Sequence, residues 1–213
     1  IGEKSEIRPG VVLDASSGPI IIDSNVYIDI GALIQGPIYI GSGTKINPGA
    51  KLRKNISLGQ MCKIGGEIED VIFHGFVNKQ HDGFIGHSYV GEWVNLGANT
   101  NNSDLKNNYS EIKIQFEKTK ISTGQFFFGS IISDYVRTGI STMLNTGTII
   151  DLGANIFDSH FKLKYFPKFY WDEQNRTELN KFFKTIEIMK KRRGKQLLES
   201  EKILISNIYE KKI

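Results

Sequence analysis

An aliphatic residue stands at every sixth position over a long central part of this 213-residue chain. The series consists of Ile22, Ile28, Ile34, Ile40, Ile46, Leu52, Leu58 and Ile64. Neither the period of an α-helix nor the two-residue alternation of a strand produces a period of six. A fixed short period is typical of solenoids, in which stacked repeats bury one continuous core. The period therefore restricts the chain to a repeat architecture.

A second series of small or apolar residues follows each aliphatic residue after four positions. It consists of Val26, Ala32, Ile38, Thr44, Ala50, Ile56 and Cys62. Together the two series predict a parallel β-helix of hexapeptide repeats, shaped as a triangular prism, in which each hexad forms one short strand and a turn. The aliphatic side chains point inward because they must leave water, and the small ones because a prism corner offers little room.

The repeat continues beyond Ile64 after a shift of two residues, with one long interruption. The expected inward positions are Ile1, Ile7 and Leu13 before the series, and Ile72, Asn78, Phe84, Val90, Leu96, Ile132, Thr138, Leu144, Ile150 and Ile156 after it. Residues 99–131 form the interruption, with an Asn-rich loop over 99–108 and a predicted hairpin over 109–128. Loops that leave a solenoid gather on one face and often build a site.

The composition changes after Ile156. Residues 159–176 are predicted to form an aromatic and basic connector that lies against the prism end. From residue 177 to residue 213 the apolar spacing becomes helical, with one stripe of Leu179, Phe182, Phe183, Ile186 and Met189 and a second of Leu197, Leu204 and Ile208. We expect these helices to cap the last coil of a β-helix that spans residues 1–158, because an open end exposes unpaired strand edges.

Charge and composition argue against several classes of protein. The net charge of +4 is modest, and the dense basic run Lys190–Arg193 is interpreted as a solvated helix end, so we expect no nucleic acid partner. Cys62 is the single cysteine, which excludes a disulfide within the chain and indicates a reducing, cytoplasmic location. No apolar stretch reaches the roughly 18 residues of a membrane span, so no membrane partner is expected.

A metal site is not expected either. β-Helix carbonic anhydrases need three histidines that converge on zinc. His81 and His87 are one hexad apart and are therefore predicted on different faces, while His74 and His160 have no histidine stacked on them. The pattern does not predict a zinc hydratase.

Three short segments resemble a known enzyme family. They are Lys79-Gln80-His81, Tyr89-Val90-Gly91 and Val94-Asn95-Leu96-Gly97-Ala98. Here the chain resembles the acetyltransferase domain of the bifunctional N-acetylglucosamine-1-phosphate uridyltransferase/glucosamine-1-phosphate acetyltransferase enzymes. The run Val136–Ile140 and the insertion before it are more similar to the archaeal and Bacteroidetes sugar-phosphate nucleotidyltransferases that carry a related β-helix. The resemblance implies a left-handed β-helix, acetyl-CoA as co-substrate and a homotrimer.

The resemblance also implies roles for residues that face the substrate. His81 corresponds to the general base that deprotonates the amine of an amino-sugar phosphate before it attacks the thioester. Asn95 corresponds to an asparagine that holds the sugar, and Arg53 to an arginine that binds the sugar phosphate. Lys79 is a further candidate for a phosphate contact.

For the cofactor, the resemblance points to Ala98 and Ala154 as small residues beside the pantetheine arm and to Arg137 as a phosphate contact. Two positions depart from the family pattern. Asp104 stands in the substrate loop where the family has an asparagine, and a carboxylate cannot donate a hydrogen bond to a thioester carbonyl. Phe84 replaces a tyrosine that touches the substrate.

Two functions remain open from the sequence. In the first, the chain transfers an acetyl group to the nitrogen of an amino-sugar 1-phosphate in nucleotide-sugar biosynthesis, as the C-terminal domain of a nucleotidyltransferase whose N-terminal domain is expected outside this chain. In the second, it is a non-catalytic β-helix that trimerises such a nucleotidyltransferase. The match at His81, Asn95 and Arg53 favours the first function, and the departures at Asp104 and Phe84 support the second.

Overall fold

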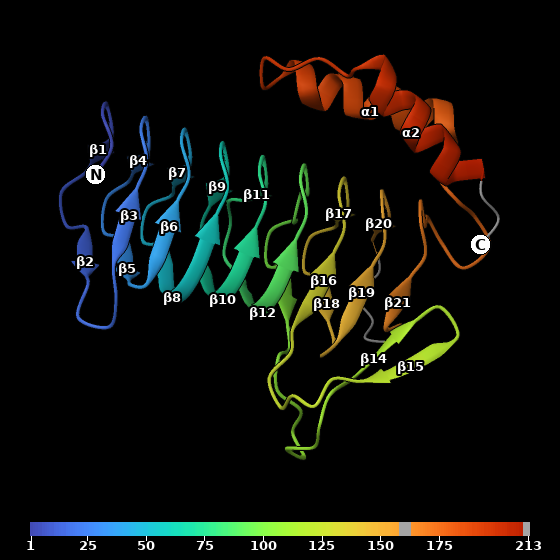
Figure 1. The fold of residues 1–213 in the computed structure, drawn as a ribbon, viewed down its shortest axis with the longest axis horizontal. Helices are drawn as coiled ribbons and strands as arrows, with labels where there is room; N and C mark the ends of the chain where they lie inside the picture. Colours follow the sequence, from blue (N-terminus) through green and yellow to red (C-terminus); the bar gives the residue numbers. More distant parts are fainter. Residues whose placement is uncertain (158–162, 211–213) are drawn as a thin grey trace.

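A computed structural model describes residues 1–157 and 163–210 of the chain. They form a parallel β-helix followed by two helices, with the first coil far from the helices (Figure 1). The predicted fold class, a parallel β-helix with an inserted hairpin and a helical extension, is confirmed. Neither of the two described helices is long and apolar enough to cross a bilayer.

Each coil supplies strands to three flat faces of the prism. Face 1 contains β1 (Glu6–Ile7), β4 (Tyr27–Ile28), β7 (Lys45–Ile46), β9 (Lys63–Ile64), β11 (Asn78–Lys79), β17 (Arg137–Thr138) and β20 (Asn155–Ile156), with Asn95 bridging β11 and β17. Face 2 contains β2 (Val12–Asp14), β5 (Leu33–Gln35), the first halves of β8 (Lys51–Leu58), β10 (Glu67–Phe73) and β12 (Phe84–Val90), and then β13 (Asn101–Asn102) and β18 (Met143–Leu144). Face 3 contains β3 (Ile20–Ile22), β6 (Ile38–Ile40), the second halves of the same long strands, β16 (Ser130–Ile132), β19 (Thr148–Ile150) and β21 (Tyr165–Phe166).

The two predicted series form the core of the prism. Every residue of both series is buried, from Ile22 and Val26 to Cys62 and Ile64. The strand register stacks Ile22 on Ile40 and Ile40 on Leu58, which is the spacing that three hexads require. Each fully buried aliphatic side chain contributes about 1.5–3 kcal/mol relative to an exposed one. The six-residue period is therefore the pattern of burial itself.

Ile1, Ile7 and Leu13, which were predicted to point inward, are exposed in the first coil. The predicted register is also wrong in one later coil. The inward residues there are Phe73, Lys79 and Ile85 rather than Ile72, Asn78 and Phe84. A β-bulge between Glu69 and Val71 shortens this coil and pairs Leu58 with Phe73, so that Ile72 is 51% exposed. Because three apolar residues follow one another at 71–73, the sequence pattern could not distinguish the two registers. From Val90 onward the predicted inward residues are buried.

The insertion contains the predicted hairpin and begins later than predicted. β14 (Lys113–Phe116) and β15 (Thr119–Ser122) pair antiparallel and project from the prism (Figure 1). Asn101 and Asn102 still belong to the prism, because β13 pairs with β18. The chain rejoins the solenoid at Gly129, whose N–H donates to the carbonyl of His87 at 2.9 Å.

The helices α1 (Leu179–Lys191) and α2 (Glu199–Glu210) lie along the side of the later coils and do not cap the last one (Figure 1). Phe182 and Ile186 of α1 are buried against the corner between faces 3 and 1. In α2 the buried residue is Ile205, and the predicted Leu204 is exposed. The predicted boundary between β-helix and connector, at residues 158 and 159, lies outside the described residues.

Candidate functional site

A column of polar side chains follows the corner between faces 2 and 3. Asn55, Asp70 and His87 occupy this corner in three successive coils, with φ of 55°, 51° and 46°. Asn55 Nδ2 donates to Asp70 Oδ1 at 2.6 Å, and Asp70 Oδ2 lies 3.6 Å from His87 Nε2. The same positive φ recurs at the corner of Phe76 and Trp93, so this corner is distinguished by its polar side chains and not by its backbone. The column is therefore a candidate site.

The insertion supplies the fourth member of this column. Asp104 Oδ2 lies 2.8 Å from His87 Nδ1, which is hydrogen-bond distance. The main chain holds this arrangement from both sides, because Phe128 N–H donates to the Asp104 carbonyl at 2.8 Å and Gly129 N–H donates to the His87 carbonyl at 2.9 Å. Both ends of the insertion are thus fixed beside the imidazole.

Gly86 allows the carboxylate to approach so closely. A Cβ atom at this position would lie 2.4 Å from the Phe84 ring and 2.6 Å from Asp104 Oδ2, which is closer than non-bonded atoms approach. The Phe84 ring and the Asp104 carboxylate therefore both pack against Gly86, directly before His87. The resemblance leads one to expect a tyrosine in place of Phe84. Any side chain at residue 86 would displace the ring or the carboxylate.

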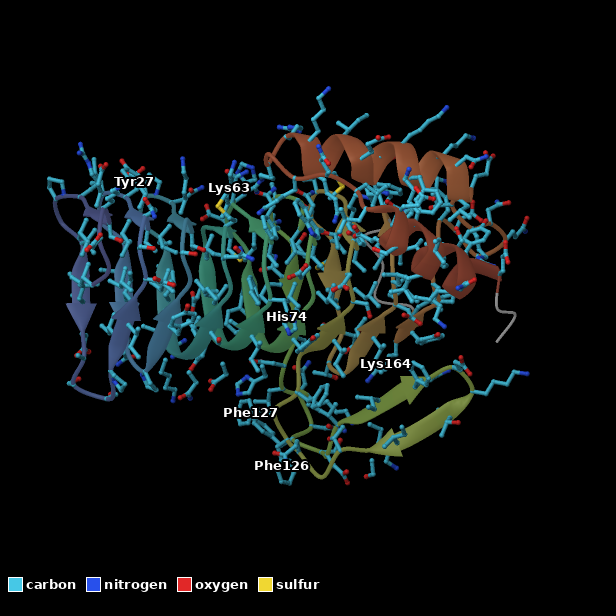
Figure 2. All side chains as sticks on the ribbon, turned by 45° about the horizontal axis from the view of Figure 1, so that its top comes forward. Tyr27, Lys63, His74, Phe126, Phe127 and Lys164 are labelled. Carbon is cyan, nitrogen blue, oxygen red and sulfur yellow. The ribbon has the colours of Figure 1, made fainter. Side chains whose placement is uncertain are left out.

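Aromatic residues of the insertion cover one side of the imidazole. The Phe127 ring stacks on His87, with centroids 5.0 Å apart and planes inclined by 27°. Phe126 and Phe127 are themselves exposed on the insertion (Figure 2). The His87 side chain retains 28% of its accessible surface. A small molecule can therefore reach the ring.

This geometry suits proton transfer. A hydrogen bond to the Asp104 carboxylate requires the proton on Nδ1, which leaves a lone pair on Nε2. The 3.6 Å separation from Asp70 is too long for a hydrogen bond, so Nε2 is free to accept a proton. The two carboxylates face the ring and can balance the charge that it acquires. The column has the components of a general base.

His81, the base predicted from the sequence, has a different environment. Its side chain is exposed and makes no hydrogen bond or ion pair with any described residue, and only its carbonyl is engaged, by Lys79 Nζ. No carboxylate orients its ring, so the structure points to His87 instead. Polar residues at one corner of successive coils, Asn55, Asp70 and His87, were the sequence signal that could have identified it.

Lys79 lies inside the prism and is not available to a substrate phosphate. Its side chain is 2% exposed, and Nζ donates to the carbonyls of Gly65 at 2.9 Å and His81 at 2.8 Å. Burial lowers the pKa of Lys79 to about 8, and the nearby Asp82 carboxylate partly opposes this effect. The predicted phosphate contact is wrong because the register shift turns residue 79 inward.

The other predicted substrate residues make no hydrogen bond or ion pair with His87 among the described residues. Arg53, on face 2, forms ion pairs with Glu67 at 3.2 Å and Glu69 at 3.0 Å. Asn95 lies on face 1, where its Oδ1 accepts a hydrogen bond from Asn78 Nδ2 at 2.5 Å. Of the residues predicted for the substrate site, Asp104 is the one that contacts His87.

The three predicted cofactor residues do not converge. Ala154 is fully buried in the prism interior and cannot line a surface groove, so this prediction is wrong. Ala98 is half-buried at the corner between faces 1 and 2, where its carbonyl accepts from Ser141 N–H at 2.7 Å. Arg137 lines a cavity of about 770 Å³ with Trp171 and Arg176, and burial lowers its pKa.

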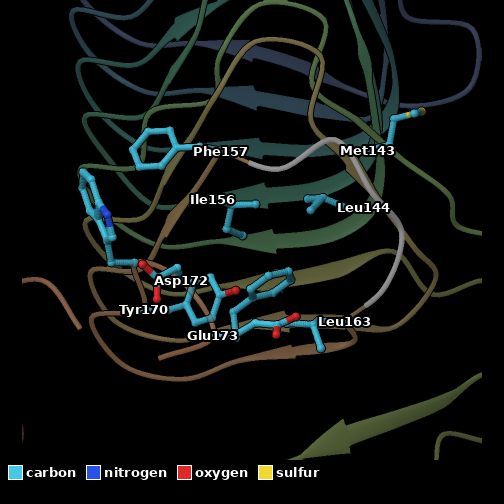
Figure 3. A pocket seen from close by; sticks show the side chains of 10 residues that line it. Met143, Leu144, Ile156, Phe157, Leu163, Tyr170, Asp172 and Glu173 are labelled. Atoms are coloured by element: carbon cyan, nitrogen blue, oxygen red, sulfur yellow. The ribbon is translucent and has the colours of Figure 1, made fainter. Parts of the chain in front are cut away.

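A further cavity of about 450 Å³ lies near the C-terminal end of the prism (Figure 3). Its lining consists of Met143, Leu144, Ile156, Phe157, Leu163, Phe166, Tyr170, Trp171, Asp172 and Glu173. His87 and Asp104 do not belong to this lining, so the cavity is separate from the polar column. Within residues 1–157 and 163–210, no group of three or more His, Cys, Asp or Glu side chains is placed to hold a metal ion.

Comparison with known proteins gives one relative in sequence. The chain is 35% identical over 98 residues to a bifunctional sugar-1-phosphate nucleotidylyltransferase/acetyltransferase of Sulfurisphaera tokodaii. The match covers 45% of this chain and 24% of that protein, so the chain spans about a quarter of the length of its relative. No protein-family profile matches the chain.

Similar solved structures are distant. A GDP-perosamine N-acetyltransferase variant of Caulobacter crescentus, in complex with CoA and GDP-perosamine, is 16% identical, with a TM-score of 0.25 over 71% of this chain and 50% of that one. A Bacillus cereus protein described as an acetyltransferase is 12% identical, with a TM-score of 0.28 over 84% and 90% of the two chains. At these TM-scores neither structure supports an inference about function.

Proposed function

We propose that the chain is an acyltransferase that uses His87 as its general base. The observation that carries the proposal is the 2.8 Å contact between His87 Nδ1 and Asp104 Oδ2, in a column that leaves Nε2 free. The sequence relationship to a bifunctional nucleotidylyltransferase/acetyltransferase supports the same reaction class. From the sequence alone, Asp104 counted against acyl transfer because the family has an asparagine there. In the structure it supports the proposal, because its carboxylate is the partner of His87.

The chain's residues can perform the reaction in two proton transfers. Acetyl-CoA supplies the acetyl group as a thioester. His87 Nε2 takes a proton from the amine of the acceptor, and the amine nitrogen bonds to the acetyl carbon. As the carbon–sulfur bond breaks, the imidazolium returns the proton to the departing thiolate. Asp104 holds the ring in the required tautomer throughout.

Asp70 is suited to the acceptor amine. Asn55 fixes its Oδ1, and its Oδ2 lies beside His87 Nε2 without a hydrogen bond to it. A neutral amine placed against this pair can donate one N–H to the Asp70 carboxylate and the other to His87 Nε2, which acts as its base. This arrangement selects an amine over a hydroxyl acceptor.

Within this proposal, the acceptor is an amino-sugar 1-phosphate in nucleotide-sugar biosynthesis, and the active assembly is a homotrimer. Face 3 supports self-association, because a row of outward apolar residues follows its strands. The row consists of Ile21, Tyr39, Ile72 and Tyr89, all exposed, and Ser57 interrupts it between Tyr39 and Ile72. In a cyclic trimer such a face contacts a different face of the neighbouring copy, because the contacts of a three-fold ring are heterologous.

The test measures thiol release from acetyl-CoA with glucosamine 1-phosphate and galactosamine 1-phosphate as acceptors. We expect His87→Ala to lower the rate by about 10²-fold or more. His81→Ala is the matched control, because it removes an exposed histidine from a neighbouring turn, and it should leave the rate within a factor of two. Loss in the His81 variant alone would contradict the assignment. No release with either acceptor, from a folded trimer, would favour the non-catalytic function.

A further inference from the structure

A cluster of cations faces a small cavity on the side of the prism that carries the helices. The cavity, of about 170 Å³, lies between face 1 and the C-terminal end of α1. Its polar lining consists of Lys63, Asn78, Gln80, Asn95, Arg192 and Arg193. Lys63 projects from β9 near the turn that follows α1 (Figure 2). The end of α1 therefore brings residues distant in sequence to one place.

These cations lack the acidic partners that neighbouring cations have. In the helices, Lys190 pairs with Glu201 at 2.7 Å, Lys181 with Glu178 at 2.9 Å and Lys202 with Glu199 at 3.5 Å. By contrast, Lys63, Arg192 and Arg193 form no ion pair with any carboxylate in the described part of the chain. Three unpaired cations around one cavity repel one another, and an anion between them removes this repulsion.

The electrostatic environment confirms that the cations are close enough to interact. Burial lowers the pKa of Lys63, and the nearby Arg193, Lys45 and Arg192 lower it further. Burial and Arg192 also lower the pKa of Arg193. The free energy that an anion recovers is largest where charges are partly removed from water, as at Lys63 and Arg193, while Arg192 is exposed.

The site is held in place before any ligand binds. Arg193 Nη1 donates to the Met61 carbonyl at 3.0 Å, which anchors the guanidinium and leaves its other N–H groups free. The Phe76 and Trp93 rings, stacked 4.1 Å apart, form the apolar part of the lining. The sequence predicts that the basic run Lys190–Arg193 is a solvated helix end. In the structure Lys190 is buried and Arg193 holds the turn against the prism, so part of this run stabilises the fold.

Two amides add hydrogen-bonding capacity. Asn78 Nδ2 donates to Asn95 Oδ1 at 2.5 Å. The side-chain oxygen of Asn78 is buried and has no hydrogen-bond partner among the described residues. Oxygen and nitrogen of an amide are assigned from such networks. Exchanging both assignments preserves the shared bond and places an N–H₂ group at the unpaired position. Both amides line the cavity, and this atom of Asn78 is itself buried.

We propose that this cavity binds the phosphoryl group of a small phosphorylated molecule, at a site separate from His87. Guanidinium groups bind phosphate oxygens through paired N–H donors, and a lysine adds a point charge. A volume of about 170 Å³ accommodates a phosphate or a diphosphate, with the rest of the ligand outside. His87 lies at the corner between faces 2 and 3, whereas Lys63 and Asn78 lie on face 1. The site does not depend on the proposed acyl transfer.

Calorimetric titration with inorganic pyrophosphate tests the proposal directly. The variant Lys63→Gln/Arg192→Gln removes two charges and keeps Arg193, which anchors the turn. Lys184→Gln/Lys191→Gln is the matched control, because it removes two exposed charges of α1 that do not line the cavity. We expect the first variant to weaken binding at least tenfold and the control to leave it within twofold, at constant ionic strength.

Two results would overturn the proposal. One is equal weakening in both variants, which indicates general attraction by net charge. The other is no heat of binding by the wild-type protein up to roughly 10 mM pyrophosphate, the weak end of a specific contact. Parallel titrations with inorganic phosphate, glucosamine 1-phosphate and coenzyme A identify the source of the phosphoryl group, because the true ligand binds most tightly and loses affinity in the first variant alone.

Discussion

The corner that carries Asp70 and His87 and the corner that carries Phe76 and Trp93 both place residues with positive φ at one position in successive coils. At the first corner these residues are polar and partly exposed, and an insertion folds over them. At the second they are aromatic and buried, and α1 covers them. One backbone conformation therefore carries the proposed site at one corner and a docking surface for α1 at the other.

The difference shows what a solenoid leaves to its side chains. The interior series fixes the backbone, so corner residues do not need to stabilise the prism. Asn55, Asp70 and His87 can then be selected for chemistry, while Phe76 and Trp93 bury apolar surface under a helix. Variants at the two corners should consequently affect different properties: activity at the first and stability at the second.

The largest effect is expected at the aromatic corner. Phe182 of α1 is fully buried and contacts Phe169 and Tyr135, with ring centroids 5.1 Å and 5.9 Å away. Phe182→Ala should lower the free energy of unfolding by about 3–5 kcal/mol, because it removes this contact area and leaves a cavity. Urea denaturation measures the change. Lys184→Ala, on the exposed side of the same helix, should stay within about 0.5 kcal/mol. A loss below about 1 kcal/mol for Phe182→Ala would mean that the helix is not docked there.

The interior offers the next largest effect, through Lys79. The lysine is charged in both the folded and the unfolded chain below pH 8, where its burial costs stability. Because the folded pKa is lowered to about 8, the folded chain loses this proton between about pH 8 and 10 while the unfolded chain keeps it. The free energy of unfolding should therefore rise with pH in this window, by about 1 kcal/mol per pH unit.

The variant Lys79→Met isolates the contribution of Lys79 to the pH dependence of the unfolding free energy. The difference in unfolding free energy between wild type and variant should grow from pH 8 to pH 10 in favour of the wild type. Parallel slopes for the two proteins would show that Lys79 does not titrate inside the prism. Denaturation at three pH values within the window is sufficient to decide.

A smaller effect, on rate, is expected at the polar corner. Asp104→Asn keeps the shape of the side chain, but its amide can donate to Nδ1 and so favour the wrong tautomer of His87. The value of kcat/KM should fall about 10-fold or more, while the melting temperature stays close to that of the wild type. Asp82→Asn, an exposed carboxylate outside the column, is the control. Equal loss in both variants would remove Asp104 from the proposed mechanism.

The sequence was sufficient to predict the interior and insufficient to predict the site, for physical reasons. Burial repeats with the coil, so the residues from Ile22 to Ile64 could be placed without coordinates. The bulge beside Asp70 changes the coil length without any marker in the sequence, and this misplaced Lys79. The contact of His87 with Asp104 depends on how the insertion folds back, which periodicity does not encode.

The smallest effect tests how far the polar column extends. Asn55→Gly removes the 2.6 Å hydrogen bond to Asp70 and keeps the left-handed backbone, because glycine adopts φ near 55° without a steric cost. Stability should fall by about 0.5–1.5 kcal/mol, the contribution of one hydrogen bond. If Asp70 holds the acceptor amine, KM for the amine should rise about two- to threefold, with kcat unchanged, because this corresponds to a small loss of ground-state binding. A change in kcat without a change in KM would mean that Asn55 helps to orient His87. The residues that support the general base would then include Asn55 and Asp70 as well as Asp104.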